Sequence, residues 1–353
     1  MKRQRAGVVG GAVSAVALAG LAGAHAVRKV AKRKHGDPFA DENFGVIDSD
    51  RARTVIADDG VEIAVRECGS PDAAITMVFS HGFSNRMTSF HLQRKLLADR
   101  WDDVRMVFYD LRGHGLSGEP PDEHSSIEQL GRDLNSVIAA VAPTGPVVLV
   151  GHSMGGMTVL ATARQFPELF ASRVVGIGLL STTAAGIARN GLGRNLHNPA
   201  LDGFRLVVRA SPGLVQLGRV TARTVIWPIL HAASFRTDVS PSLAKFTYEM
   251  IDDTSVVTIV KFLKALELHD ETATLPVLED IPALVLSGDA DMVIPFAGAV
   301  KIAEALPNSE LVRVEGAGHM VHLEFPDVVN DALDRLLDRA RVYQSTPKRV
   351  RVG

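Results

Sequence analysis

The chain has 353 residues, of which 46% are hydrophobic and 22% are charged, and it contains a single cysteine. This composition is typical of a globular protein with enough apolar material for a large core, and one cysteine excludes an internal disulfide. Residues 1–35 carry eight basic side chains and no acidic one, so the remainder carries a formal charge of −10 within a total of −2. An acidic body argues against nucleic acid as a partner.

The N-terminal segment, residues 1–34, is predicted to be an apolar helix with basic flanks. Residues 6–27 contain no charged side chain. As a helix they would extend about 33 Å, enough for the roughly 30 Å hydrocarbon core of a bilayer. Small residues recur at every fourth position, which also suits helix-mediated self-association. More basic residues follow the helix than precede it, so we expect membrane association through residues 6–27 and a cytoplasmic body.

Two other interpretations of this segment stay open. Ala24-His25-Ala26 resembles a signal-peptide cleavage site, which would make the protein secreted, although the basic run at 28–34 would hinder export. The segment could also be a soluble extension without stable structure. Residues 35–50 indicate a linker, and residues 346–353 a basic tail.

From residue 51 onward, apolar strands alternate with helices. Predicted strands are 53–57, 61–67, 74–79, 104–109, 146–150, 174–180, 283–287 and 311–314. Predicted helices are 90–98, 125–141, 154–165 and 328–342. This alternation favours a parallel sheet with helices on both faces and with ligands bound beyond the carboxyl ends of the strands.

Between Thr182 and Pro282 the sequence shows no clear strand. A loop of that length without structure would be unusual, and helical patterns occur at 243–251 and 255–267. We therefore expect a helical cap at 184–282, inserted into a core made of residues 51–183 and 283–345. Some apolar cap residues should line a pocket above the sheet.

Ser153 is the candidate nucleophile. It lies in Gly151-His152-Ser153-Met154-Gly155, between a predicted strand and a predicted helix. In a G-x-S-x-G motif with this context, a sharp strand-to-helix turn pushes the hydroxyl out over the sheet. Such a serine needs a base, an orienting carboxylate and two backbone N–H donors for the oxyanion. The donors are expected to be Met154 and, in the loop after an earlier strand, Phe83.

The base and the acid must come from loops at the same sheet edge. His319 follows the last strand in a loop with two glycines, whereas His322 falls in the next segment and His152 lies inside the turn. His319 is therefore the predicted base. The strand 283–287 is followed by Asp289 and Asp291, and this reasoning leaves both as candidate acids.

Several blocks together resemble the α/β-hydrolase superfamily, in its cap-bearing serine esterase/lipase-like branch, over about residues 50–342. They are Asp59-Gly60, His81-Gly82-Phe83, Asp110–Ser117, Gly151–Gly156, and Gly288–Pro295 with Gly318-His319. The resemblance implies an α/β-hydrolase fold, with a mostly parallel central sheet, helices on both faces and an inserted helical cap. It also assigns the acid to Asp291, the fourth residue of a G-x-x-D block that leads to Pro295. Similar epoxide hydrolases and haloalkane dehalogenases carry Asp at the nucleophile position, so Ser153 disfavours those activities.

The expected function is hydrolysis of an ester, thioester or related acyl bond of an apolar or lipid-like small molecule, without metal or cofactor. Ser153 would attack, His319 would transfer its proton and Asp291 would orient the imidazole, while Phe83 and Met154 would hold the oxyanion. Two alternatives stay open. One is a carbon–carbon bond hydrolase or cofactor-free perhydrolase with the same three residues, and the other is a non-catalytic ligand-binding member of the fold.

Overall fold

A computed structural model describes residues 36–186 and 234–346 of the chain. Within them, the strands form one sheet of eight in the order β1-β2-β4-β3-β5-β6-β7-β8. The strands are β1 (Arg51–Ile56), β2 (Glu62–Cys68), β3 (Ile75–Ser80), β4 (Val104–Tyr109), β5 (Val147–His152), β6 (Val174–Leu180), β7 (Ala283–Gly288) and β8 (Ser309–Val314). The pairings β1–β2 and β2–β4 are antiparallel and the rest are parallel, so the sheet is mostly parallel, as the sequence predicts.

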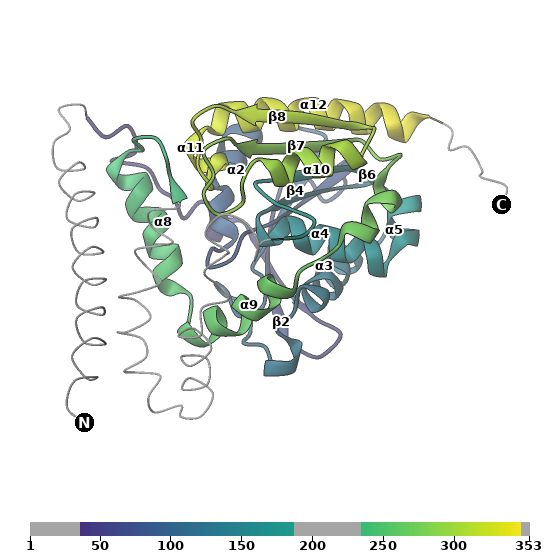
Figure 1. The fold of residues 1–353 in the computed structure, drawn as a ribbon, viewed down its shortest axis with the longest axis horizontal. Coiled ribbons are helices and arrows are strands. Elements are labelled where there is room, and N and C mark those ends of the chain that lie inside the picture. Colours follow the sequence, from purple (N-terminus) through teal and green to yellow (C-terminus); the bar gives the residue numbers. More distant parts are fainter. Residues whose placement is uncertain (1–35, 187–233, 347–353) are drawn as a thin grey trace, which may run out of the picture.

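Helices cover both faces of the sheet (Figure 1). The flanking helices are α2 (His91–Leu97), α3 (Ile127–Val141), α4 (Met154–Gln165), α5 (Pro167–Ser172), α10 (Ala297–Ala305) and α12 (Pro326–Ser345). One hydrophobic core lies under α3, α4, α5 and α10, and a second lies under α2 and α12. In β3, Val78 belongs to the first core and Met77 and Phe79 to the second, because successive side chains of a strand point to opposite faces.

The predicted strands and helices are found within three residues of their expected ends. The sequence does not predict α5 and α10. In α10 only Ala299 and Ile302 are buried, so this alanine-rich helix has too few large apolar side chains to show a helical period. The other short helices of the described residues are η1 (Ile47–Ser49), η2 (Met87–Phe90), η3 (Asp122–His124), η7 (Thr272–Leu278) and α11 (Val321–Glu324).

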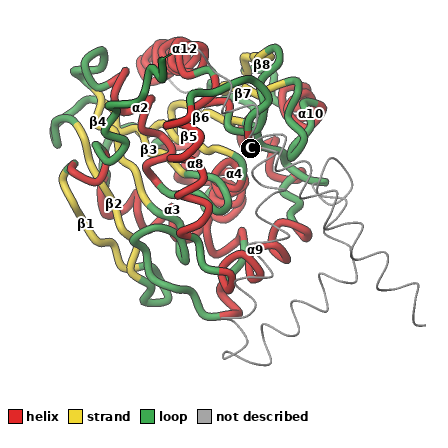
Figure 2. The backbone as a smooth tube through the Cα atoms, turned by 90° about the vertical axis from the view of Figure 1, so that its left-hand side faces the viewer, coloured by secondary structure: helices red, strands yellow, loops and turns green. Residues whose placement is uncertain are grey.

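Among the described residues, two α-helices lie between β6 and β7, where the sequence predicts a cap. They are α8 (Pro241–Asp253) and α9 (Val256–Leu268), and α8 lies in front of the sheet in Figure 2. Each begins at a serine that caps it: the hydroxyl of Ser240 accepts the N–H of Leu243, and that of Ser255 accepts the N–H of Thr258. The full extent of a cap at 184–282 stays a prediction, because residues 187–233 lie outside the described residues.

Residues 37–50, here called the strap, pack against the body at the place where the sequence predicts a linker. On one side the strap touches α8: Asp37 accepts the N–H of Ser242, and Phe44 stacks on Phe246 at a ring separation of 4.3 Å. On the other side its carboxylates pair with cations on or beside α2, in the pairs Glu42–Lys95, Asp48–Arg86 and Asp50–Arg94. The strap therefore bridges α8 and α2.

The localisation expected from the sequence, a membrane-associated protein held by one helix, is corrected. Neither 36–186 nor 234–346 contains a helix that is both long and apolar enough to cross a bilayer. The longest described helix, α12, has 20 residues, but it buries only one face and carries charged side chains such as Asp334 and Arg335 on the other. Residues 6–27, on which the anchor and the helix-mediated self-association were predicted, lie outside the described residues.

Candidate active site

Ser153 occupies the turn between β5 and α4 in a strained backbone conformation, with φ +52° and ψ −117°. A non-glycine residue adopts a positive φ only when its surroundings enforce it. Here the start of α4 presses against β3 and β5. A Cβ atom on Gly155 would lie 2.0 Å from the carbonyl oxygen of Ser80, and one on Gly151 would lie 2.4 Å from the backbone of Gly155. The glycines of the motif are thus sterically required for the turn that presents the Ser153 hydroxyl.

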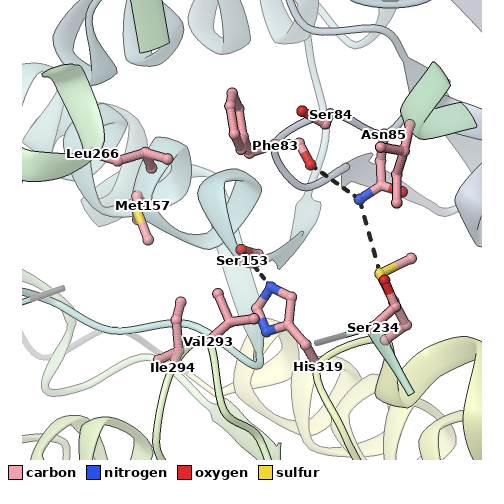
Figure 3. A pocket seen from close by; sticks show the side chains of 12 residues that line it. Phe83, Ser84, Asn85, Ser153, Met157, Ser234, Leu266, Val293, Ile294 and His319 are labelled. Atoms are coloured by element: carbon pink, nitrogen blue, oxygen red, sulfur yellow. Dashed lines mark hydrogen bonds between the residues drawn. The ribbon is translucent and has the colours of Figure 1, made fainter. Parts of the chain in front are cut away.

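The structure brings the predicted nucleophile, base and acid together. His319 Nε2 lies 2.9 Å from Ser153 Oγ (Figure 3). On the other side of the ring, His319 Nδ1 lies 2.8 Å from Asp291 Oδ2. The other oxygen of Asp291 accepts the N–H groups of Val293 and Ile294, at 2.8 and 3.0 Å. Because an ionised carboxylate can only accept, this arrangement places the imidazole proton on Nδ1 and turns Nε2 toward the serine hydroxyl as an acceptor.

The other candidate acid has a different role. Asp289 forms an ion pair with Arg313, with nitrogen–oxygen distances of 2.9 and 3.0 Å, and accepts the N–H of Gly316 at 2.7 Å. These contacts hold the beginning of the histidine loop, residues 315–320. Asp289 therefore supports the loop, whereas Asp291 contacts the imidazole itself.

The other two histidines near the site do not contact the Ser153 hydroxyl. His322 is fully buried, with ring separations of 4.3 Å to His152 and 5.1 Å to Phe90. His152 donates from Nε2 to the carbonyl oxygen of His319 at 2.9 Å. His152 therefore holds the backbone of His319, and His322 packs against His152.

The two expected oxyanion donors flank Ser153. Met154 begins α4, where a backbone N–H has no partner within the helix. Phe83 follows Gly82, on which a Cβ atom would lie 3.2 Å from the Cβ of Ser153, so this loop lies against the serine. Neither N–H donates a hydrogen bond to a described residue. His81 holds the loop, since its Nε2 accepts the N–H of Leu111 at 2.9 Å and its Nδ1 donates to the Gly82 carbonyl at 2.8 Å.

Comparisons with known proteins identify the family and the fold of the chain. The model of the alpha/beta hydrolase family matches residues 77–332. The chain belongs to this family. A Haemophilus influenzae protein whose name suggests an esterase or lipase is 26% identical over 267 residues, which are 74% of this chain and 83% of that protein. Epoxide hydrolase 1 of Caenorhabditis elegans is 25% identical over 287 residues, which are 77% of this chain and 67% of that protein.

A thermophilic esterase from Thermogutta terrifontis is among the similar solved structures. Its TM-score to this chain is 0.66 at 24% identity, and the match covers 82% of this chain and 99% of that one. At such an identity the likeness establishes the fold alone. Family and fold together make the protein an α/β hydrolase.

In this α/β hydrolase a pocket opens beside Ser153 and His319, with Met157, Leu266 and Ile294 to one side in Figure 3 and Asn85 and Ser234 to the other. Its lining is mainly apolar. The lining residues are Phe83, Ser84, Asn85, Ser153, Met157, Ser234, Ile251, Leu266, Val293, Ile294, His319 and Met320. Ile251 of α8 and Leu266 of α9 were not predicted individually. Their helical spacing is that of ordinary buried residues, so no local signal separates a pocket-lining position from a core position.

The buried histidines predict how the stability of this α/β hydrolase depends on pH. Burial lowers the pKa of His114 to about 4 and that of His322 to about 3, and it keeps the pKa values of His81 and His152 well below normal. Unfolding returns each pKa to about 6.5. Below that pH the unfolded chain therefore binds more protons, and the free energy of unfolding falls as the pH is lowered from about 6.5 toward 4.

We expect His322→Phe to reduce this loss, because it removes one of the titrating groups. Between pH 7 and pH 5 the variant should lose about 2 kcal/mol less unfolding free energy than the wild type. Urea titrations at the two pH values measure the difference. Equal losses in the two proteins would contradict the assignment of His322 as a buried neutral histidine.

Proposed function

We propose that this α/β hydrolase is a serine hydrolase that cleaves an ester, thioester or related acyl bond through an acyl-enzyme. The observation that carries the proposal is the continuous series of contacts from Ser153 Oγ through His319 to Asp291. Serine is a weak nucleophile at neutral pH, and a base oriented by a carboxylate is the arrangement that activates it.

In the proposed mechanism, Ser153 Oγ attacks the carbonyl carbon of the substrate while His319 Nε2 takes the hydroxyl proton. Asp291 stabilises the imidazolium that forms, because its carboxylate accepts a hydrogen bond from the Nδ1–H group and carries the opposite charge. The oxyanion of the tetrahedral intermediate receives the N–H groups of Phe83 and Met154, and each such donor contributes about 3 kcal/mol to transition-state stabilisation. His319 then returns the proton to the leaving group, and water releases the acyl group by the same steps.

The pocket supports an uncharged, apolar group on the substrate. Among its described lining residues there is no Lys, Arg, Asp or Glu, and the apolar ones include Phe83, Met157, Leu266 and Met320. A charged group there would lose hydration without gaining a counter-charge. The esterase or lipase named for the Haemophilus influenzae relative is consistent with this class. An epoxide hydrolase reaction, as named for the Caenorhabditis elegans relative, fits less well, because Ser153 occupies the nucleophile position at which similar epoxide hydrolases carry an aspartate.

A fluorophosphonate probe tests the proposal, because it forms a stable covalent bond only with an activated serine. We expect wild-type protein to be labelled and Ser153→Ala to remain unlabelled. Ser172→Ala, which changes an exposed serine at the end of α5, is the matched control and should label as the wild type does. Equal labelling of the wild type and Ser153→Ala would overturn the proposal. A series of p-nitrophenyl esters of increasing acyl length would then define the acyl preference of the pocket.

A further inference from the structure

The carboxylate of Glu324 joins two segments that are far apart in the sequence. Glu324 is the last residue of α11, and its Oε2 accepts the N–H of Gly318 at 2.6 Å. Its Oε1 accepts the N–H of Arg236 at 2.9 Å and that of Thr237. Gly318 directly precedes His319, and residues 234–237 lead into α8. One carboxylate therefore fastens the histidine loop to the segment that begins the second described part of the chain.

The two segments are in close contact beyond this carboxylate. A Cβ atom on Gly318 would lie 3.0 Å from the backbone nitrogen of Arg236, so a side chain at position 318 would crowd the backbone of the other segment. The N–H of Met320 donates to the carbonyl oxygen of Ser234 at 2.9 Å. Ser234 and Met320 both line the pocket. Residues 234–237 are thus joined to the histidine loop on both sides of His319, directly at Met320 and through Glu324 at Gly318.

The contacts of Glu324 are directional. Among the described residues its carboxylate has no Lys or Arg partner, and its charge is met by backbone N–H groups alone. Hydrogen bonds from N–H donors to an ionised acceptor are short and geometrically specific. The histidine loop needs such a restraint, because Gly316 and Gly318 give it little rigidity of its own and Gly316 adopts φ +73°.

We propose that Glu324 is a positioning residue, which holds His319 at hydrogen-bond distance from Ser153 by fixing the histidine loop to residues 234–237. This inference rests on the proposed function, because it assigns to Glu324 an effect on the base of that reaction. Glu324 touches neither the nucleophile nor the pocket, so it acts through the peptide of Gly318.

The substitution Glu324→Gln separates the two halves of this contact. A glutamine amide has one accepting oxygen and one donating NH₂ group. We expect the amide oxygen of the glutamine to face the N–H groups of Arg236 and Thr237, because two donors lie there. The NH₂ group then faces the N–H of Gly318, and two donors repel each other. Glu324→Gln therefore releases the histidine loop and leaves 236–237 fastened, whereas Glu324→Ala releases both.

The test measures the covalent labelling of Ser153 by a fluorophosphonate from about pH 6 to about pH 9, which reports the state of the base. It is done below the unfolding temperature of every variant, and it separates the maximal rate constant kinact from the half-saturating concentration KI. We expect Glu324→Gln to lower kinact by about tenfold or more, to shift the midpoint of the pH profile, and to leave KI within about twofold of wild type. Glu324→Ala should lower kinact and also raise KI.

The matched control is Glu315→Gln, which removes an exposed carboxylate from the same loop and should reproduce the wild-type profile. A Glu324→Gln protein with wild-type kinact and an unchanged pH profile would overturn the inference, even if its thermal midpoint were lower. Failure of the proposed function has a different signature: wild-type protein would not be labelled, or Ser153→Ala would be labelled equally, and the inference would then fall with it.

Discussion

Asp291→Asn is expected to lower the kcat for an acyl ester by about 10⁴-fold. The oxygen of the new amide should keep the N–H groups of Val293 and Ile294, which now bind Asp291 Oδ1. Its NH₂ group then faces His319 and donates to Nδ1. The imidazole must carry its proton on Nε2 instead, where it can no longer accept the hydroxyl proton of Ser153.

The control for this prediction lies two residues away in the same loop. Asp289→Asn keeps an amide oxygen that can accept the N–H of Gly316, and it weakens only a partly exposed pair with Arg313, so kcat should stay within about threefold of wild type. Initial rates with a short-chain p-nitrophenyl ester, together with circular dichroism to verify folding, measure both variants. Equal losses in the two proteins would contradict the different roles assigned to Asp289 and Asp291.

The largest expected loss of stability comes from Arg112→Met. The guanidinium of Arg112 is fully buried, with nitrogen–oxygen distances of 2.6 Å to Asp133 and 2.7 and 2.9 Å to Asp59. The hydrogen bonds from Arg112, followed by that from His124, hold the pKa of Asp59 well below its usual value. Removing the cation leaves the buried carboxylate of Asp133 without its ion-pair partner, and we expect a loss of about 3–5 kcal/mol in the free energy of unfolding.

Urea denaturation measures this loss, and two further variants make it specific. Arg341→Met removes a half-exposed pair with Asp103 and should cost less than about 1 kcal/mol. The double variant Arg112→Met with Asp133→Leu should recover part of the stability, because it removes the stranded carboxylate as well. If Arg112→Met lowered the free energy of unfolding no more than Arg341→Met does, the buried ion pair would contribute no more to stability than the half-exposed one, which would contradict the prediction.

This cluster also explains two blocks that the sequence marks without assigning chemistry to them. Asp59 lies in the β1–β2 turn, Arg112 follows β4, and Asp133 lies on α3. Their contacts fix the loop after β4 against the turn between the antiparallel strands β1 and β2. Asp110, in the same loop, accepts the N–H groups of Met87 and Leu116, and burial raises its pKa to about 6. The segment Asp110–Ser117 is therefore held by buried polar contacts beside the site.

Local sequence patterns predict much of this fold and the residue types of its site. Apolar runs that end in Gly-rich loops locate β5 and β7, and the parallel sheet then brings Ser153 and the acid-bearing loop to one edge. The choice between Asp289 and Asp291 depends on how the loop turns after β7. The two residues are only two positions apart, and their spacing does not determine that turn. That choice came from the family resemblance, and in the structure it is Asp291 that contacts His319.

Contacts between distant segments account for the remainder. The carboxylate of Glu324 meets the backbone of Arg236, which lies 88 residues away, and Ile251 and Leu266 reach the pocket through the packing of α8 and α9. Neither periodicity nor motif spacing records such contacts. The helix α10 also escapes prediction, because it buries too few apolar side chains to show a helical period in the sequence.

The strap has a mechanical consequence. A force applied upstream of Asp37 is carried first by the hydrogen bond of Asp37 to α8, the helix that bears Ile251 of the pocket wall. The pairs of Glu42 with α2 come next along the strap. A force applied after Ser345 is carried by α12, which lies across the second core with its buried face against the sheet. We therefore expect tethering by the N-terminal side to load α8, which bears part of the pocket wall, and tethering by the C-terminal side to load α12, which contributes no residue to the described pocket lining.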